Sequence, residues 1–279
     1  MNDLVLVVRD LHSGYGDEDV LHGVSIAVKR GGVVAVIGPN GSGKSTLLKT
    51  IYGLLPARQG QVTLFDAQGD AHDLTRLRTH RITALGMNMV PQLANVFPEM
   101  SVLENLEIGV LPVRHRFDEQ LGKVLTSLPM LGRLLHRRAA TLSGGQRQML
   151  GVARALMSDP TLVILDEPTA GLAPAVREEV LARVRTINAN GVSILIVEQR
   201  ARQCLAMADH AYILDQGRNR LEGPGQLLLQ DPEVVRLYLG VQAGHRGKAL
   251  GRRADPVRTE WNAGRNEGSN AEGHDGPLE

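Results

Sequence analysis

Short apolar, mostly β-branched runs recur along the chain and alternate with segments of helical periodicity. Runs such as VVAVI and LVIL are apolar at nearly every position, as expected of strands that are covered on both faces. The first two runs are separated by a polar turn, which is typical of an antiparallel edge sheet. The pattern predicts an α/β fold with a mainly parallel core sheet and an antiparallel β subdomain at its edge. The runs lie at residues 4–8, 24–28, 33–37, 162–165, 192–197 and 211–214.

The character of the chain changes in its middle and again near its end. Amphipathic segments such as SVLENLEIG and FDEQLGKVLTSL, punctuated by prolines, predict a helical subdomain at residues 92–150. We interpret this subdomain as an insertion into an α/β core formed by residues 1–91 and 151–240. Residues 241–279 are rich in Gly, Arg, Asn and acidic side chains, which predicts a disordered tail to which we assign no function.

Composition narrows the classes of protein. With 279 residues and 43% hydrophobic content, the chain can bury one sizeable core, or one core and a subdomain. The 31 basic and 30 acidic side chains leave a net charge of +1, so no strong field indicates a nucleic-acid partner. No apolar stretch approaches the roughly 20 residues of a membrane helix. If the protein acts at a membrane, we therefore expect it to do so from outside the bilayer. The single cysteine, Cys204, falls in a predicted helix and is expected to be a buried, inert thiol.

A glycine-rich loop follows the run VVAVI and precedes the helical pattern LLKTIYGLL. Glycines adopt the backbone shapes that aim several N–H donors at one point, and a helix N-terminus adds positive potential. This strand–loop–helix context distinguishes the loop from a simple turn and predicts an ATP-binding P-loop, in which Lys44 contacts the β- and γ-phosphates and Ser45 holds Mg²⁺. The loop comprises Gly38, Pro39, Asn40, Gly41, Ser42, Gly43, Lys44, Ser45 and Thr46.

Two acidic residues, Asp166 and Glu167, follow the apolar run at residues 162–165. A carboxylate at the end of a buried strand can reach Mg²⁺ through water, and its neighbour can orient or deprotonate the attacking water. Alone, such a pair is more often a solvated strand end or a helix cap. In a chain that also carries a P-loop, we assign Asp166 to the metal and Glu167 to the water.

A second candidate anion site is the segment LSGGQ, which precedes the helical pattern RQMLGVARALM. A serine N-cap and two glycines at a helix start let the backbone approach a phosphate closely. By itself, the segment would be read as a capped helix start. Its position between the P-loop and LVILDE favours phosphate binding instead. Its members are Leu142, Ser143, Gly144, Gly145 and Gln146.

These motifs, in this order, resemble those of the ATP-binding subunits of ABC transporters, and the resemblance runs from about residue 4 to residue 240. It implies an ABC-type P-loop ATPase that binds ATP and Mg²⁺ and hydrolyses ATP to ADP and phosphate. It further implies that residues 38–46 are the Walker A loop and that LSGGQ is the family signature. In the same way, Asp166 is the Walker B acid and Glu167 the catalytic base.

The resemblance also implies roles for residues outside these motifs. Tyr15 in SGYG would stack on adenine, since an aromatic platform accepts any base, although it could be an ordinary turn aromatic. Gln92 in VPQ would touch Mg²⁺ from the Q-loop, with a simple loop amide as the alternative. Gln199 in VEQ occupies the position of the switch histidine, and residues 170–173 occupy the D-loop.

Two of these positions depart from the family pattern. Gln199 can donate a hydrogen bond to the γ-phosphate but cannot carry a positive charge, which suggests weaker hydrolysis at this chain's own site. The D-loop ends in Ala173 instead of the usual Asp, which puts one contact across the dimer in doubt. Both features, together with DEPTAGLAP and the closing YLG, resemble the ATPases of importers for branched-chain amino acids and of their relatives for urea and short amides.

The resemblance implies a peripheral subunit at the cytoplasmic face of the cell membrane. Its expected partners are a second ABC ATPase, two membrane permease subunits and an extracytoplasmic solute-binding protein. The second ATPase is usually a different chain in the resembled importers, and a homodimer stays open. Because one signature helix cannot reach its own P-loop phosphate, each signature should close on the ATP of the other subunit. Hydrolysis would then reopen the dimer.

Other classes of ATPase share some of these motifs. DNA-repair and chromosome ATPases carry long coiled-coil heptads between them, and this sequence has none. Translation-associated relatives usually hold two cassettes in one chain, whereas this chain has one. A regulatory protein that binds ATP without hydrolysing it stays an alternative, against which the presence of Glu167 argues.

Overall fold

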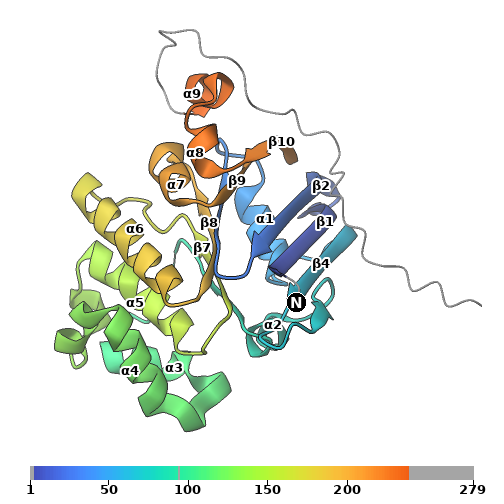
Figure 1. The fold of residues 1–279 in the computed structure, drawn as a ribbon. Helices are drawn as coiled ribbons and strands as arrows, with labels where there is room; N and C mark the ends of the chain where they lie inside the picture. The colour runs from blue at the N-terminus through green and yellow to red at the C-terminus, as the bar shows by residue number, and fades with distance from the viewer. Residues whose placement is uncertain (1–2, 94, 239–279) are drawn as a thin grey trace, which may run out of the picture.

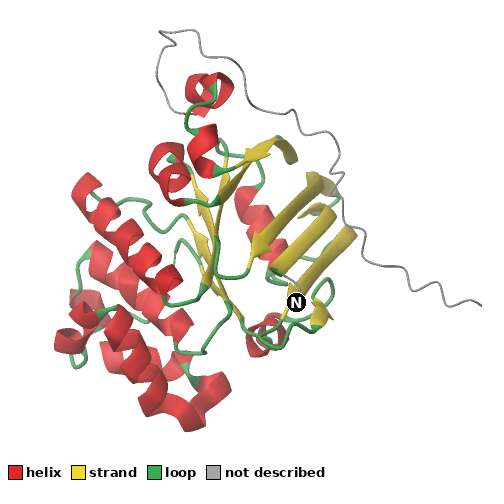
Figure 2. Cartoon of the chain, viewed as in Figure 1, coloured by secondary structure: helices red, strands yellow, loops and turns green. Residues whose placement is uncertain are grey.

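The computed structural model describes residues 3–93 and 95–238 (Figure 1). The predicted tail at residues 241–279 lies outside the described residues. Two β-sheets organise the fold, with helices around them (Figure 2). Within the described ranges, no helix combines the length and the apolar character that a membrane span requires.

The larger sheet has six strands in the order β10-β9-β3-β8-β7-β6. Strands β9, β3, β8, β7 and β6 are parallel to one another, and β10 is antiparallel to β9. Every residue of β3, β7 and β8 is buried, which is why their sequences are apolar at nearly every position. The predicted mainly parallel core sheet is therefore confirmed. The strands are β3 (Val33–Ile37), β6 (Met87–Val90), β7 (Leu162–Asp166), β8 (Ser193–Glu198), β9 (His210–Asp215) and β10 (Arg218–Gly223).

The smaller sheet is antiparallel and has the order β2-β1-β4-β5. The predicted pair of edge strands is present as β1 and β2, but each is twelve residues long and extends past its apolar run. The sequence pattern misses β4 and β5 because several of their residues are exposed, which breaks the apolar run. The strands are β1 (Leu4–Tyr15), β2 (Glu18–Lys29), β4 (Gln59–Phe65) and β5 (Ala71–Asp73).

The helices fall into two groups by the face of the core sheet that they cover. Alternate residues of β3 point to opposite faces, so Val34 and Val36 join a core shared with α1 and the small sheet, whereas Ala35 and Ile37 join a core shared with α5 and α6. Helices α1 and α5 therefore lie on opposite faces of the sheet (Figure 2). The helices are α1 (Lys44–Ile51), α2 (Thr79–Ala84), α3 (Val102–Gly109), α4 (Phe117–Ser127), α5 (Gly144–Leu156), α6 (Pro174–Ala189), α7 (Ala201–Met207), α8 (Gly225–Leu228) and α9 (Pro232–Tyr238), with 3₁₀ turns at Leu111–Arg116, Pro129–Leu134 and Ala139–Thr141.

Cys204 lies in α7 and is fully buried. Burial raises the pKa of its thiol far above the usual range, because the thiolate would lose its hydration. The prediction of a buried thiol is thus confirmed, and the raised pKa agrees with low reactivity.

Side chains of the core sheet fasten the small sheet to it. The Asn219 amide of β10 spans the backbone of Ser25 in β2, accepting from its N–H at 3.0 Å and donating to its carbonyl oxygen at 2.8 Å. The Tyr212 hydroxyl of β9 accepts a hydrogen bond of 3.0 Å from the N–H of Ala27, also in β2. These bonds satisfy backbone groups that no neighbouring strand pairs on that side.

We expect Asn219→Ala to lower the free energy of unfolding by about 2 kcal/mol, since it removes two hydrogen bonds and leaves two backbone groups of Ser25 unpaired. Urea denaturation followed by circular dichroism measures the change. Asn190→Ala is a matched control, because the Asn190 amide bonds the Ser127 hydroxyl at the surface; its cost should stay within about 0.5 kcal/mol. Equal losses in the two variants would contradict the role of Asn219.

Candidate functional site

The glycine-rich loop connects the end of β3 to the start of α1, as its sequence predicts. Gly41 and Gly43 have φ angles of 80° and 99°, in the left-handed region that favours glycine. A Cβ atom at Gly38 would overlap the carbonyl oxygen of Leu214, and one at Gly43 would lie 2.8 Å from a methyl carbon of Leu21. The loop shape therefore requires glycine at these positions.

The polar groups of the loop are arranged for an anion. The Lys44 side chain is 5% exposed, and its ammonium donates to the carbonyl oxygens of Gly38 at 2.8 Å and Pro39 at 2.9 Å. The buried Ser42 hydroxyl has no hydrogen-bond partner among the described residues. An unpartnered buried hydroxyl costs about 1–3 kcal/mol, which a phosphate oxygen at this place would offset.

The next feature is a contact between Ser45 and Asp166, two of the three residues assigned to the metal together with Gln92. The Ser45 hydroxyl donates to the Asp166 carboxylate at 3.3 Å, across 121 positions of sequence. In the part of the chain that the structure describes, no group of three or more His, Cys, Asp or Glu side chains could hold a metal ion. Two protein ligands suit Mg²⁺, which keeps several waters and binds through one or two carboxylates together with substrate phosphates.

Burial sets the electrostatics of this region. It lowers the pKa of Lys44, against the opposing pull of the nearby carboxylates of Glu167, Asp166 and Glu198. Burial also raises the pKa of Asp166, and the charge of Glu167 raises it further. A bound cation would relieve the repulsion between these carboxylates, so the residues present fit Mg²⁺.

Glu167 is held from two sides. Its carboxylate accepts a hydrogen bond of 3.1 Å from the Gln92 amide, which lies 75 positions away in sequence. Its backbone N–H donates to the carbonyl oxygen of Val197 at 2.9 Å, and its φ angle is 45°. Such a φ at a residue other than glycine is strained and persists only where surrounding contacts enforce it.

Tyr15 is the last residue of β1, and its ring is half-exposed. The Lys49 ammonium lies 5.9 Å from the ring centre and 3.4 Å from the hydroxyl, so a cation covers part of this platform. The turn after Tyr15 is clamped by Arg58, whose guanidinium donates to the carbonyl oxygens of Gly16 and Asp17 and to the Asp19 carboxylate. Sequence reasoning misses Arg58 because no motif marks it.

The signature segment lies elsewhere. Ser143 is the N-cap of α5, as predicted, and forms a capping box with Gln146 through hydrogen bonds of 3.3 and 3.0 Å. Since α5 and α1 cover opposite faces of the core sheet, the structure does not bring LSGGQ to the P-loop of the same chain. Gln199, which follows β8, is exposed.

The fold and this site define a P-loop ATPase: a strand–loop–helix phosphate cradle with two acidic residues at the end of another buried strand of the same sheet. A family model described as ABC transporter matches residues 21–170. The chain belongs to the ABC transporter family and is an ATP-hydrolysing subunit of it.

Similar proteins and structures agree with this assignment. The chain is 39% identical to the high-affinity branched-chain amino acid transport ATP-binding protein BraG of Pseudomonas aeruginosa, over 81% of this chain and 95% of that protein. It is 32% identical to the lipopolysaccharide export system ATP-binding protein LptB of Escherichia coli, over 84% of this chain and 97% of that protein. The crystal structure of an ATP-binding cassette of an ABC transporter in its ADP conformation superposes on this chain with a TM-score of 0.74. It is 33% identical in sequence, and the match covers 85% of this chain and 99% of that chain.

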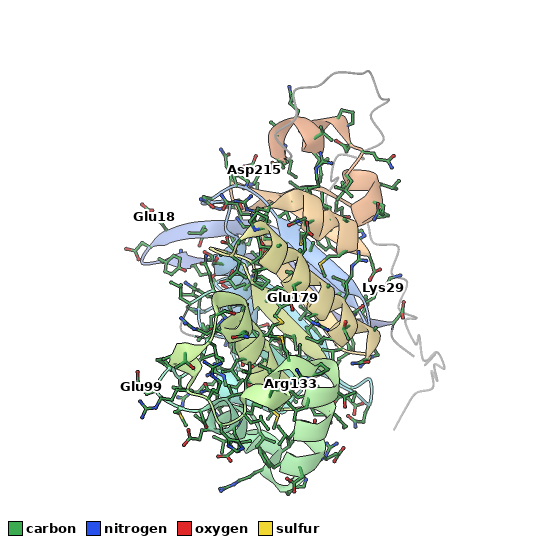
Figure 3. The ribbon with its side chains drawn as sticks, turned by 90° about the vertical axis from the view of Figure 1, so that its left-hand side faces the viewer. Glu18, Lys29, Glu99, Arg133, Glu179 and Asp215 are labelled. Atoms are coloured by element: carbon green, nitrogen blue, oxygen red, sulfur yellow. The ribbon has the colours of Figure 1, made fainter. Side chains whose placement is uncertain are left out.

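We expect Lys44→Ala to weaken binding of MgATP by about tenfold to hundredfold, because it removes a charge-assisted contact to phosphate. Fluorescence titration with a labelled ATP analogue measures the affinity. Lys29→Ala is the control, because Lys29 is exposed and lies at the end of β2 away from Glu18 and the Tyr15 turn (Figure 3). Unchanged affinity in Lys44→Ala would contradict the proposed phosphate contact.

Proposed function

We propose that this chain is the ATP-hydrolysing subunit of an importer for branched-chain amino acids and that it acts peripherally at the cytoplasmic face of the membrane. The main support for an ATPase site is a pair of hydrogen bonds beside the P-loop. One joins the Ser45 hydroxyl to the Asp166 carboxylate, and the other joins the Gln92 amide to the Glu167 carboxylate. The solute class is supported by the 39% identity to BraG, compared with 32% to LptB. An importer for urea or short amides is the alternative.

In this proposal the groups of the site divide the work of hydrolysis. Lys44 and the backbone N–H groups of residues 38–46 bind the phosphates of ATP. Ser45, Asp166 and Gln92 would hold Mg²⁺, which would supply positive charge next to the phosphates. Glu167 orients the attacking water and accepts its proton. Tyr15 stacks on adenine.

The arrangement of α1 and α5 supports a site shared between two subunits. LSGGQ starts a helix on the opposite face of the core sheet from α1, which supports a role at the ATP of another subunit. We therefore infer a dimer in which each signature closes on the partner's nucleotide. A second, different ATPase chain would make its two sites unequal, and a homodimer is the alternative.

The segment after Gln92 offers a surface for the permease subunits. Leu93 is 77% exposed and Phe97 is 45% exposed, although both are large and apolar. The guanidinium of Arg154 lies 5.1 Å from the Phe97 ring centre and holds the ring from one side. Exposed apolar side chains next to a residue that touches Glu167 suit a contact through which membrane subunits and their solute-binding protein influence hydrolysis.

We expect Glu167→Gln to reduce the rate of ATP hydrolysis at least about hundredfold and to accumulate an ATP-bound dimer, because Gln can orient water but cannot take its proton. Phosphate release and size-exclusion chromatography with MgATP measure the two effects. Glu179→Gln, on the exposed face of α6 (Figure 3), should leave both unchanged. Normal turnover in Glu167→Gln would overturn the assignment of the base.

Gln199 is the position where this chain departs from the family pattern. If its neutral amide limits hydrolysis, Gln199→His should raise the turnover of the purified subunit about fivefold, since a charge-assisted hydrogen bond is roughly twice as strong as a neutral one. Gln199→Ala should lower turnover. A homodimer that hydrolyses ATP at full rate and is indifferent to Gln199→Ala would contradict the unequal-site hypothesis.

A further inference from the structure

Glu198 is the last residue of β8 and directly precedes Gln199. Its side chain is only 3% exposed, which is unusual for a carboxylate unless a specific partner holds it. Neither the P-loop motif nor the acidic pair Asp166 and Glu167 at the end of β7 accounts for a third carboxylate beside the site. Burial raises the pKa of Glu198, and the charge of nearby Glu167 adds to the effect.

The partner of this carboxylate is the turn that follows Glu167. The Glu198 carboxylate accepts a hydrogen bond of 3.0 Å from the backbone N–H of Thr169, a residue that is itself 4% exposed. The carbonyl oxygen of Val197 accepts another, of 2.9 Å, from the N–H of Glu167. The last two residues of β8 therefore hydrogen-bond to both ends of the three-residue segment 167–169.

These hydrogen bonds matter because the backbone of the segment is strained at Glu167. Glu167 has a φ angle of 45°, which costs free energy in any residue other than glycine and must be enforced by its surroundings. The turn closes on itself through a bond of 3.0 Å from the N–H of Ala170 to the carbonyl oxygen of Glu167. Without the Glu198 carboxylate, the buried N–H of Thr169 would lack its acceptor, and the strained conformation would lose one of its two anchors on β8.

We propose that Glu198 is a positioning residue for ATP hydrolysis, which acts through its hydrogen bond to the Thr169 N–H by holding the strained turn that aims the Glu167 carboxylate. The proposal rests on the proposed role of Glu167 as the base. Glu198 acts here as a hydrogen-bond acceptor, so its negative charge is not the required property.

The same turn leads on to the signature segment. The N–H of Leu172 donates to the carbonyl oxygen of Thr169 at 3.3 Å. A Cβ atom on Gly144 would lie 3.1 Å from a methyl carbon of Leu172, so the D-loop packs directly on the first glycine of the α5 start. The hydrogen bond from Thr169 to Glu198 therefore also holds the D-loop residues that pack against the signature segment.

Three substitutions separate the acceptor role from the charge. Glu198→Gln keeps an acceptor oxygen at the same reach without the charge, Glu198→Asp keeps the charge but is one methylene shorter, and Glu198→Met keeps the volume without an acceptor. We expect kcat to stay within about threefold of wild type in Glu198→Gln and to fall about tenfold or more in the other two, with KM for ATP changed little in all three. Glu222→Met is the matched control, a partly buried glutamate on β10, and should leave kcat unchanged.

Hydrogen exchange of the purified full-length variants provides a readout that does not depend on turnover. The Thr169 amide should lose protection in Glu198→Asp and Glu198→Met and keep it in Glu198→Gln. A fall in kcat of Glu198→Gln equal to that of Glu198→Met would overturn the proposal, because the charge would then be the essential property. Unchanged kcat in well-folded Glu198→Met would overturn it as well. Failure of the proposed base is seen separately, as normal turnover in Glu167→Gln with the exchange pattern intact.

Discussion

The parallel register of β3, β8 and β7 is the constraint on which the rest of the molecule depends. It pairs Ile37 with Glu198 and Val197 with Asp166, so the three strands end at the same edge of the sheet. A different loop follows each strand there. The phosphate loop, the acidic pair and the Gln199 segment meet there, although Gln199 lies 153 positions after Thr46, the end of the phosphate loop. Because side chains alternate along a strand and both faces of these strands are buried, a slip of one residue would exchange the side chains that pack in the core on one face with those that pack on the other. The packing of the two cores therefore enforces the geometry of the site.

The same sheet separates the two halves of the catalytic apparatus. One face carries α1 and the antiparallel sheet, and the other carries α5 and α6. A single chain therefore presents a phosphate cradle in one place and a capped, glycine-rich helix start in another. The physical cause is the core sheet between them, whose central strands are buried on both faces.

The sequence predicts much of this because its strongest signals come from the most constrained positions. The central strands are apolar throughout since both of their faces are covered. The phosphate loop is rich in glycine because its backbone leaves no room for a Cβ atom at Gly38 and Gly43 and has a positive φ angle at Gly41. Strand β5 escapes prediction because it has only three residues, and β4 because its first three residues are exposed and polar or glycine, which interrupts the apolar run. Arg58 and Glu198 escape it for another reason: their importance lies in hydrogen bonds to backbone groups that are distant in sequence, and such partners leave no mark in a single chain.

The hydrogen bond from Gln92 to Glu167 connects an exposed apolar segment to the candidate catalytic base. Gln92 belongs to the segment with exposed Leu93 and Phe97, whereas Glu167 is the group that would draw a proton from water. While the Gln92 amide occupies one carboxylate oxygen of Glu167, that oxygen is not free to accept a hydrogen bond from water. A displacement of the exposed segment would therefore release an acceptor atom on the group that we assign as the base.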